Sequence, residues 1–165
     1  MKDALLAELD REAAATRRVL ERVPEDKLAW KPHRKSMSLG TLGLHVAMVP
    51  GRVAEFLSER VREAPTFAAP EARSKGEIME AFEQGIGNAR TKLESWTEDD
   101  LRSQWTMRGE GATLMSLPRI EMLRSVMLNH WYHHRGELVV YLRLLDVPVP
   151  SIYGPTADEN PFAAR

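Results

Sequence analysis

Hydrophobic residues recur every three or four positions in four stretches of the chain, which is the spacing of one face of a helix. These stretches predict helices over residues 3–22, 39–61, 75–96 and 118–145. Ser38 and Ser74 stand directly before the second and third helices, where a side-chain oxygen can bond a free amide of the first turn. Pro118 suits the first turn of the fourth helix, because its missing N–H has no bond to make there. With few strand signals and no repeat, the pattern indicates an all-α fold.

The segments between the predicted helices are long and rich in turn-forming residues. Residues 23–38 contain two prolines and are expected to form a loop with one short helical turn. We expect a second loop at residues 64–74 and a long connection at residues 97–117. Because these segments exceed what a minimal up-and-down bundle needs, we expect one domain, residues 1–165, folded as a four-helix bundle with a long crossover connection.

Two regions that contain proline should depart from a regular helix. Pro50 lies inside the second helix and should kink it, because proline lacks the N–H that would bond the carbonyl of Val46. That free carbonyl would lie beside His45. Residues 146–165 contain four prolines and cannot form a regular helix. We therefore expect this tail to lie across the domain or across a partner.

Composition places the chain among ordinary globular proteins. Of its 165 residues 43% are hydrophobic and 28% are charged, and the net charge is -1. No block of like charge favours binding to nucleic acid. The amino-terminal segment is charged throughout, unlike a signal peptide, and no apolar run approaches the roughly 20 residues that cross a bilayer. We therefore expect a cytoplasmic protein with neither a nucleic-acid nor a membrane partner.

The chain contains no cysteine. This excludes a disulfide scaffold, a thiolate metal site and a cysteine nucleophile within the sequence. Any bound metal would have to be held by histidine and carboxylate side chains. Any thiol used in the chemistry of this protein would have to come from outside the chain.

Three of the five histidines lie in one short stretch, NHWYHHRGELVVYLR. At 100° per residue, His130, His134 and Glu137 share one face of the fourth helix. We expect that face to point toward the core, because it also carries Leu123, Val126, Met127, Tyr141 and Leu144. Trp131 and Arg135 should point away from it. Polar groups on the inner face of a bundle are costly unless something satisfies them, and a metal ion would do so.

His130 and His134 have the i, i+4 spacing at which two imidazoles of one helix can share a cation. His45 is the natural third ligand, because it lies on an apolar face of the second helix. Three histidines with an open fourth position are typical of catalytic zinc sites. The alternative is a set of partly buried histidines bonded to backbone carbonyls or to Glu137. His133 also competes with His134, since i, i+3 pairs can chelate too.

Three roles are open to Glu137: it could orient a histidine, serve as a fourth ligand or act as a general base. We favour orientation, because Glu137 lies on the ligand face one turn beyond His134. Arg135, Tyr153 and Asp158 are candidates for binding a cofactor at the rim, since the tail should fold near the mouth of the site. A fourth protein ligand from the tail, such as Asp158, would instead favour a structural metal site.

Three blocks of sequence, VPEDKLAWKPHRKSMSLGTLGLHVA, HWYHHRGELVVYLRLLDVPVP and SIYGPTADE, follow one another over nearly the whole chain. In their order and spacing they resemble the DinB/YfiT-like metal-binding four-helix proteins of the DinB superfamily. The resemblance implies a bundle with a crossover, frequent homodimers and a divalent metal held by His45, His130 and His134. It also implies that His133 is a bystander. The family often has glutamine where this chain has Glu137, which adds a negative charge close to the metal.

Characterised relatives in that family include thiol-dependent transferases and isomerases, in which a metal-bound thiolate of bacillithiol, mycothiol or glutathione attacks an electrophile. The resemblance therefore implies a zinc- or nickel-dependent S-transferase or isomerase that acts on a small-molecule substrate. A bound metal would lower the pKa of the external thiol. The alternative enzyme is a hydrolase with metal-bound water as nucleophile and Glu137 as base. A third interpretation is a non-enzymatic, metal-binding stress-response homodimer.

Overall fold

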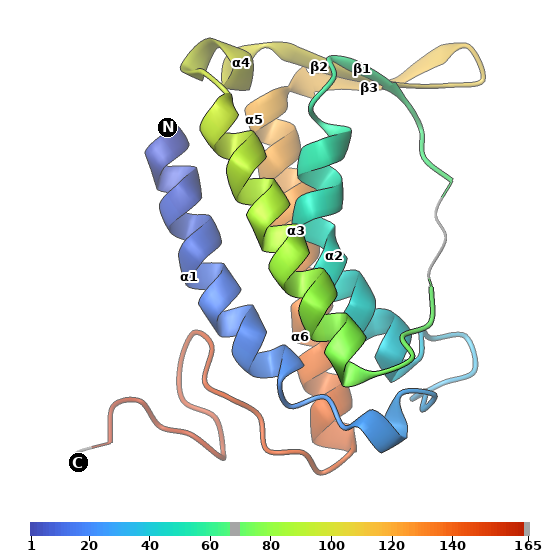
Figure 1. Ribbon diagram of the computed structural model, residues 1–165, viewed down its shortest axis with the longest axis vertical. Helices are drawn as coiled ribbons and strands as arrows, with labels where there is room; N and C mark the ends of the chain where they lie inside the picture. The colour runs from blue at the N-terminus through green and yellow to red at the C-terminus, as the bar shows by residue number, and fades with distance from the viewer. Residues whose placement is uncertain (67–69, 164–165) are drawn as a thin grey trace.

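Four long helices pack side by side in the computed structural model, which describes residues 1–66 and 70–163 (Figure 1). They are α1 (Lys2–Leu20), α2 (Leu39–Phe56), α3 (Lys75–Ser95) and a composite fourth helix of α5 (Arg119–Met122), the π-helical segment η2 (Leu123–Asn129) and α6 (His130–Leu144). A 3-10 turn, η1 (Glu25–Lys27), lies in the first connection. Three residues of the predicted loop 64–74, and the last two of the predicted domain 1–165, lie outside the described residues.

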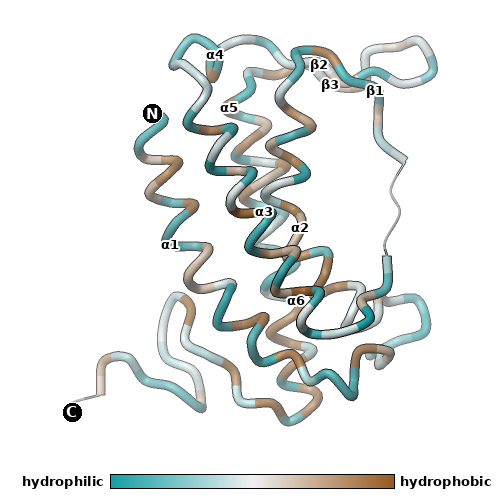
Figure 2. The backbone as a smooth tube through the Cα atoms, viewed as in Figure 1, coloured by the Kyte–Doolittle hydropathy of each residue, from teal (hydrophilic) through white to brown (hydrophobic). Residues whose placement is uncertain are grey.

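The order of the helices in space confirms the predicted bundle and its crossover. Helices α2 and α3 run in the same direction, whereas α1 and the composite fourth helix run the opposite way (Figure 1). Because α2 and α3 are parallel neighbours, the chain must return along the bundle between them. Figure 2 shows hydrophobic and hydrophilic segments alternating at short intervals along α1 and α3, as expected for helices with one face on the core.

Both predicted amino-terminal caps are present. The Ser38 hydroxyl accepts a hydrogen bond from the Thr41 amide at 3.0 Å, and the Ser74 hydroxyl accepts one from the Glu77 amide at 3.0 Å. Each cap satisfies one of the amides that a helix leaves free in its first turn. The second and third helices therefore begin where the sequence predicts.

The second predicted helix is too long, and the connection predicted at residues 97–117 is not irregular. Helix α2 ends at Phe56, and the residues that follow include a strand, β1 (Val61–Glu63). A short helix and two strands occupy the connection: α4 (Glu98–Arg102), β2 (Gln104–Gly109) and β3 (Ala112–Pro118). Strand β1 pairs parallel to β2, and β2 pairs antiparallel to β3. Pro118 accordingly ends β3 and precedes α5 instead of lying in its first turn.

The turn between β2 and β3 explains why this region forms a hairpin. Only Glu110 and Gly111 separate the strands, and both have positive φ, at 50° and 78°. Two consecutive residues of positive φ give a turn whose twist matches that of the paired strands. Trp105 of β2 is fully buried, and its ring lies 5.1 Å from that of Phe56 at the end of α2. The small sheet thereby closes one end of the bundle.

The carboxyl-terminal tail lies against the end of α1. Arg18 donates a hydrogen bond to the Ser151 carbonyl at 2.9 Å, and Arg22 donates one to the Pro148 carbonyl at 3.1 Å. Both arginines also form ion pairs with Glu159. The described part of the tail is thus packed across the domain, as expected. Within the described residues, no helix is both long and apolar enough to cross a membrane.

Candidate metal centre

Three histidine rings from α2 and α6 converge on one another. His45 comes from the middle of α2, whereas His130 is the first residue of α6 and His134 follows one turn later. Ligand nitrogens of the three rings all lie within 4.8 Å of one another, and the Nε2 atoms of His45 and His130 are 3.1 Å apart. The structure therefore brings together the three histidines that the sequence singled out.

The spacing of these nitrogens suits a small divalent cation. Imidazole nitrogens bind zinc at about 2.0–2.1 Å, so two ligands of a tetrahedral ion lie roughly 3.3 Å apart. The 3.1 Å between His45 and His130 is close to that separation. An all-nitrogen set of neutral donors also suits zinc and nickel, whereas calcium and magnesium prefer oxygen. The residues present thus fit the kind of metal that the sequence pattern predicts.

The histidines do not lie on the innermost face of the fourth helix, and the prediction that Trp131 and Arg135 point away from the core is wrong. Trp131 is 0% exposed and Arg135 is 1% exposed, whereas Leu144, predicted to face the core, is 58% exposed. His130 and His134 are only partly buried. They lie beside the core face, where solvent reaches part of each ring.

The π-helical segment η2 accounts for this rotation. A row of buried side chains repeats every four residues, at Leu123, Met127, Trp131 and Arg135. In a uniform α-helix a step of four residues turns the face by about 40°, so the row would wind away from the core. The wider turns of a π-helix absorb that drift. A projection at a constant 100° per residue therefore places the face wrongly.

A hydrogen bond beside the histidines joins the two helices that carry them. The indole Nε1 of Trp131 donates to the carbonyl of Val46 at 2.9 Å, and both groups are buried. This is the carbonyl predicted to be free, because Pro50 has no N–H to offer it. Trp131 follows His130 in the chain and Val46 follows His45. The bond therefore fixes the position of His130 relative to His45. Sequence reasoning found the free carbonyl but missed its partner.

Glu137 contacts the outer side of the histidine cluster. One carboxylate oxygen lies 2.6 Å from Nδ1 of His134, and the other lies 3.2 Å from Nε2 of His133. A carboxylate that accepts the Nδ1 proton leaves Nε2 of His134 as the nitrogen for a cation. His133, His134 and Glu137 form a second group close enough to share an ion, but the His133 side chain is 65% exposed.

Burial lowers the pKa of two of the three imidazoles, those of His45 and His130. The pKa of His45 falls from 6.5 to about 4, first because burial disfavours the charged form and then because His134, His130 and Arg52 are nearby. The pKa of His130 is also lowered, again chiefly by burial. Neutral imidazole is the form that binds metals. The environment therefore favours the protonation state that a metal site needs.

The three residues predicted to lie at the rim are found elsewhere. Arg135 is buried against α1, where it bonds Glu12 at 2.6 Å and also contacts the Tyr153 hydroxyl. Asp158 forms an ion pair with Arg143 and accepts a hydrogen bond from the backbone of the tail. Arg135 and Tyr153 thus lie together, but with α1 and not with the histidines. Asp158 belongs to neither group of potential ligands in the described part of the chain.

A bundle with parallel second and third helices, and with a histidine cluster between its second and fourth helices, defines a class of helical proteins that could hold a metal. The chain belongs to the DinB family, whose family model matches residues 1–161. It is 25% identical over 158 residues to the uncharacterized protein YrdA of Bacillus subtilis strain 168, which covers 95% of this chain and 90% of YrdA.

Two solved structures share the fold. One is a DinB-like protein, YjoA, from Bacillus subtilis, with a TM-score of 0.69 and 19% sequence identity over 90% of this chain and 97% of that one. The other is a DinB-like protein from Bacillus cereus ATCC 10987, with a TM-score of 0.71 and 19% identity over 92% of this chain and 97% of that one. At these identities the similarity shows the fold alone.

Proposed function

We propose that this protein binds a divalent metal, zinc or nickel, through His45, His130 and His134. The observation that carries the proposal is the convergence of three imidazoles from two helices, with two Nε2 atoms 3.1 Å apart. One hydrogen bond between two rings would not require a third ring in the same place. A cation shared by all three satisfies every ring nitrogen that faces the others.

The proposed activity is the attack of an external thiol, such as bacillithiol, mycothiol or glutathione, on a small electrophilic substrate. The reaction would either join the thiol to the substrate or isomerise the substrate. A metal held by His45, His130 and His134 would have a coordination position left for such a thiol and would lower its pKa. The protein itself has no cysteine to supply the sulfur. Its own residues would hold the metal, orient the ligands and bind the remainder of the thiol or substrate.

We assign Glu137 to the orientation of His134. Its contact of 2.6 Å with Nδ1 of His134 supports this role, since a carboxylate in that place holds the ring in one tautomer and raises the basicity of Nε2. Its second oxygen is directed to His133. With both oxygens near imidazoles, Glu137 is poorly placed to act as the base that a hydrolase would need.

Metal analysis of the purified protein tests the proposal. We expect one zinc or nickel ion per chain, and a stabilisation of about 2.7 kcal/mol when metal is added at 100 times its dissociation constant. His130→Ala should abolish both effects, because only two histidines remain and they are too few to hold the ion. His133→Ala is the matched control and should keep both. Equal metal binding by wild type and His130→Ala would refute the proposed ligand set.

A further inference from the structure

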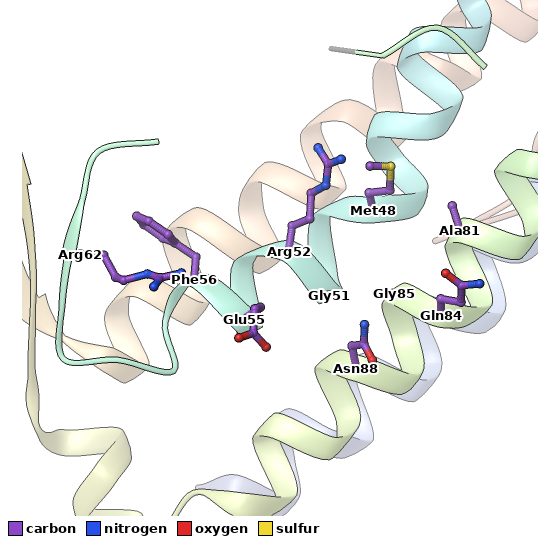
Figure 3. A pocket seen from close by; sticks show the side chains of 10 residues that line it. All are labelled: Met48, Gly51, Arg52, Glu55, Phe56, Arg62, Ala81, Gln84, Gly85 and Asn88. Atoms are coloured by element: carbon purple, nitrogen blue, oxygen red, sulfur yellow. The ribbon is translucent and has the colours of Figure 1, made fainter. Parts of the chain in front are cut away.

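A cleft of about 420 Å³ opens between α2 and α3, beginning one helical turn from His45 (Figure 3). Its size is within the range of about 300–1,000 Å³ typical of small-molecule sites. Met48 and Arg52 extend from α2, and Gln84 and Asn88 extend from α3 on the other side (Figure 3). The cleft therefore combines an apolar side chain, two amides and a cationic group.

The floor of the cleft is backbone. A Cβ atom added to Gly51 would lie 2.7 Å from both the Cα and the carbonyl oxygen of Gly85, which is closer than such atoms can approach. The two helices touch at this point because neither residue has a side chain. The side chains on either side of the contact then form the walls of an open depression on the outer surface.

Arg52 lies between this cleft and the histidine cluster. It follows His45 by seven residues, which places it about 10 Å further along α2 and about 20° from the same face. A ligand that lies along α2 from the histidines to the cleft would pass Arg52.

The charge of Arg52 is available to a ligand, in contrast to the other charges around the cleft. Arg62 forms an ion pair with Glu59, and Glu55 forms one with Lys92. Among the residues that the structure describes, none forms a hydrogen bond or an ion pair with the side chain of Arg52. A guanidinium group favours planar anions such as carboxylates, which it can bind with two parallel hydrogen bonds.

We infer that the cleft binds the distal part of a small ligand whose donor atom occupies the histidine site, and that Arg52 holds a carboxylate on that ligand. This inference rests on the proposed metal site and narrows its substrate or thiol to anionic molecules. The amides of Gln84 and Asn88 supply further hydrogen-bonding groups across the cleft. Met48 provides an apolar surface for the part of the ligand between its two ends.

The test uses cobalt-loaded protein and two series of thiols of stepwise increasing chain length. One series ends in a carboxylate and the other in a hydroxyl group, and binding is followed by the cobalt absorption spectrum. We expect the carboxylate to bind about tenfold more tightly than the hydroxyl at the lengths that reach Arg52. Arg52→Gln should remove that preference without changing the binding of the hydroxyl series.

Arg62→Gln is the matched control, because Arg62 also borders the cleft but is paired with Glu59. Arg62→Gln should keep the preference for carboxylate thiols. If Arg62→Gln loses that preference and Arg52→Gln keeps it, Arg52 is not the residue that holds the carboxylate. Cobalt binding is measured first, and its absence in the wild type would refute the metal site itself. Normal cobalt binding with no binding of either thiol series would refute the proposed use of an external thiol. Thiol binding with equal affinity for both series at every length would refute only the cleft inference.

Discussion

His134 and Arg135 are neighbours in the chain, but their side chains lie in two contrasting polar regions. The guanidinium of Arg135 is buried and bonded within the protein, to Glu12 at 2.6 Å and to Thr16 at 3.0 Å. His134 instead faces the rings of His45 and His130, and its carboxylate partner Glu137 contacts its outer nitrogen. A polar group whose hydrogen bonds are made within the chain stabilises the fold. Ring nitrogens that face one another are instead satisfied by a bound ion.

Arg135→Met should have the largest effect on stability, because it leaves the Glu12 carboxylate in a largely buried place without its cationic partner. Breaking a buried pair in this way costs about 3–5 kcal/mol in the free energy of unfolding. Urea denaturation of the metal-free protein measures the loss. The double variant with Glu12→Gln should recover part of it. A loss below about 1 kcal/mol would mean that this region does not hold the fold as we describe.

Trp131→Phe should affect both regions moderately, because it removes the hydrogen bond to Val46 while keeping an aromatic ring in the core. We expect a loss of about 1–3 kcal/mol in the free energy of unfolding, since the Val46 carbonyl is left buried without a partner. Metal affinity should fall about tenfold, as for other residues that support ligands indirectly.

The matched control for Trp131→Phe is Trp30→Phe, which alters the ring that packs edge-on against Tyr141 of α6. This variant should leave metal affinity unchanged when both proteins are titrated with zinc under the same conditions. Equal losses of metal affinity in the two variants would indicate a general effect of aromatic packing and not a specific bond between α2 and α6.

Glu137→Gln should have the smallest effect on stability, because the side chain is 41% exposed and keeps an oxygen that can accept the His134 proton. The loss of negative charge should lower metal affinity about tenfold with little change in the unfolding free energy. Competition with a chelator of known affinity measures this change. A complete loss of metal, comparable to that of His130→Ala, would instead make Glu137 a direct ligand.

The helices were predictable, and the hairpin was not. Apolar spacing and the serine caps located α2 and α3, since both signals are local and repeat along the sequence. The turn at Glu110 and Gly111 lacks the asparagine or aspartate that usually marks a two-residue hairpin. Gly111 and the alternation around Trp105 were the available signals, and they are weak because β3 is mostly exposed and has no buried face to mark it.

The site was predictable in its residues but not in its surroundings. Helical spacing joined His130 to His134, and the apolar face of α2 pointed to His45, so the trio could be named before the structure. The roles assigned to Arg135 and Tyr153 depended on where the tail docks, and the tail docks on α1. That docking is set by contacts between residues more than a hundred positions apart, which no local pattern reveals.

The sequence by itself determined which groups could take part: an i, i+4 pair of imidazoles, a proline that leaves the Val46 carbonyl without its helical partner, and no thiol in the chain. These properties follow from covalent structure and helix geometry. Only the tertiary structure decided that Trp131 donates a hydrogen bond to that carbonyl and that Arg135 faces the core. The reason is that the π-helical turns of η2 rotate α6, and their formation depends on how the whole fourth helix packs against its neighbours.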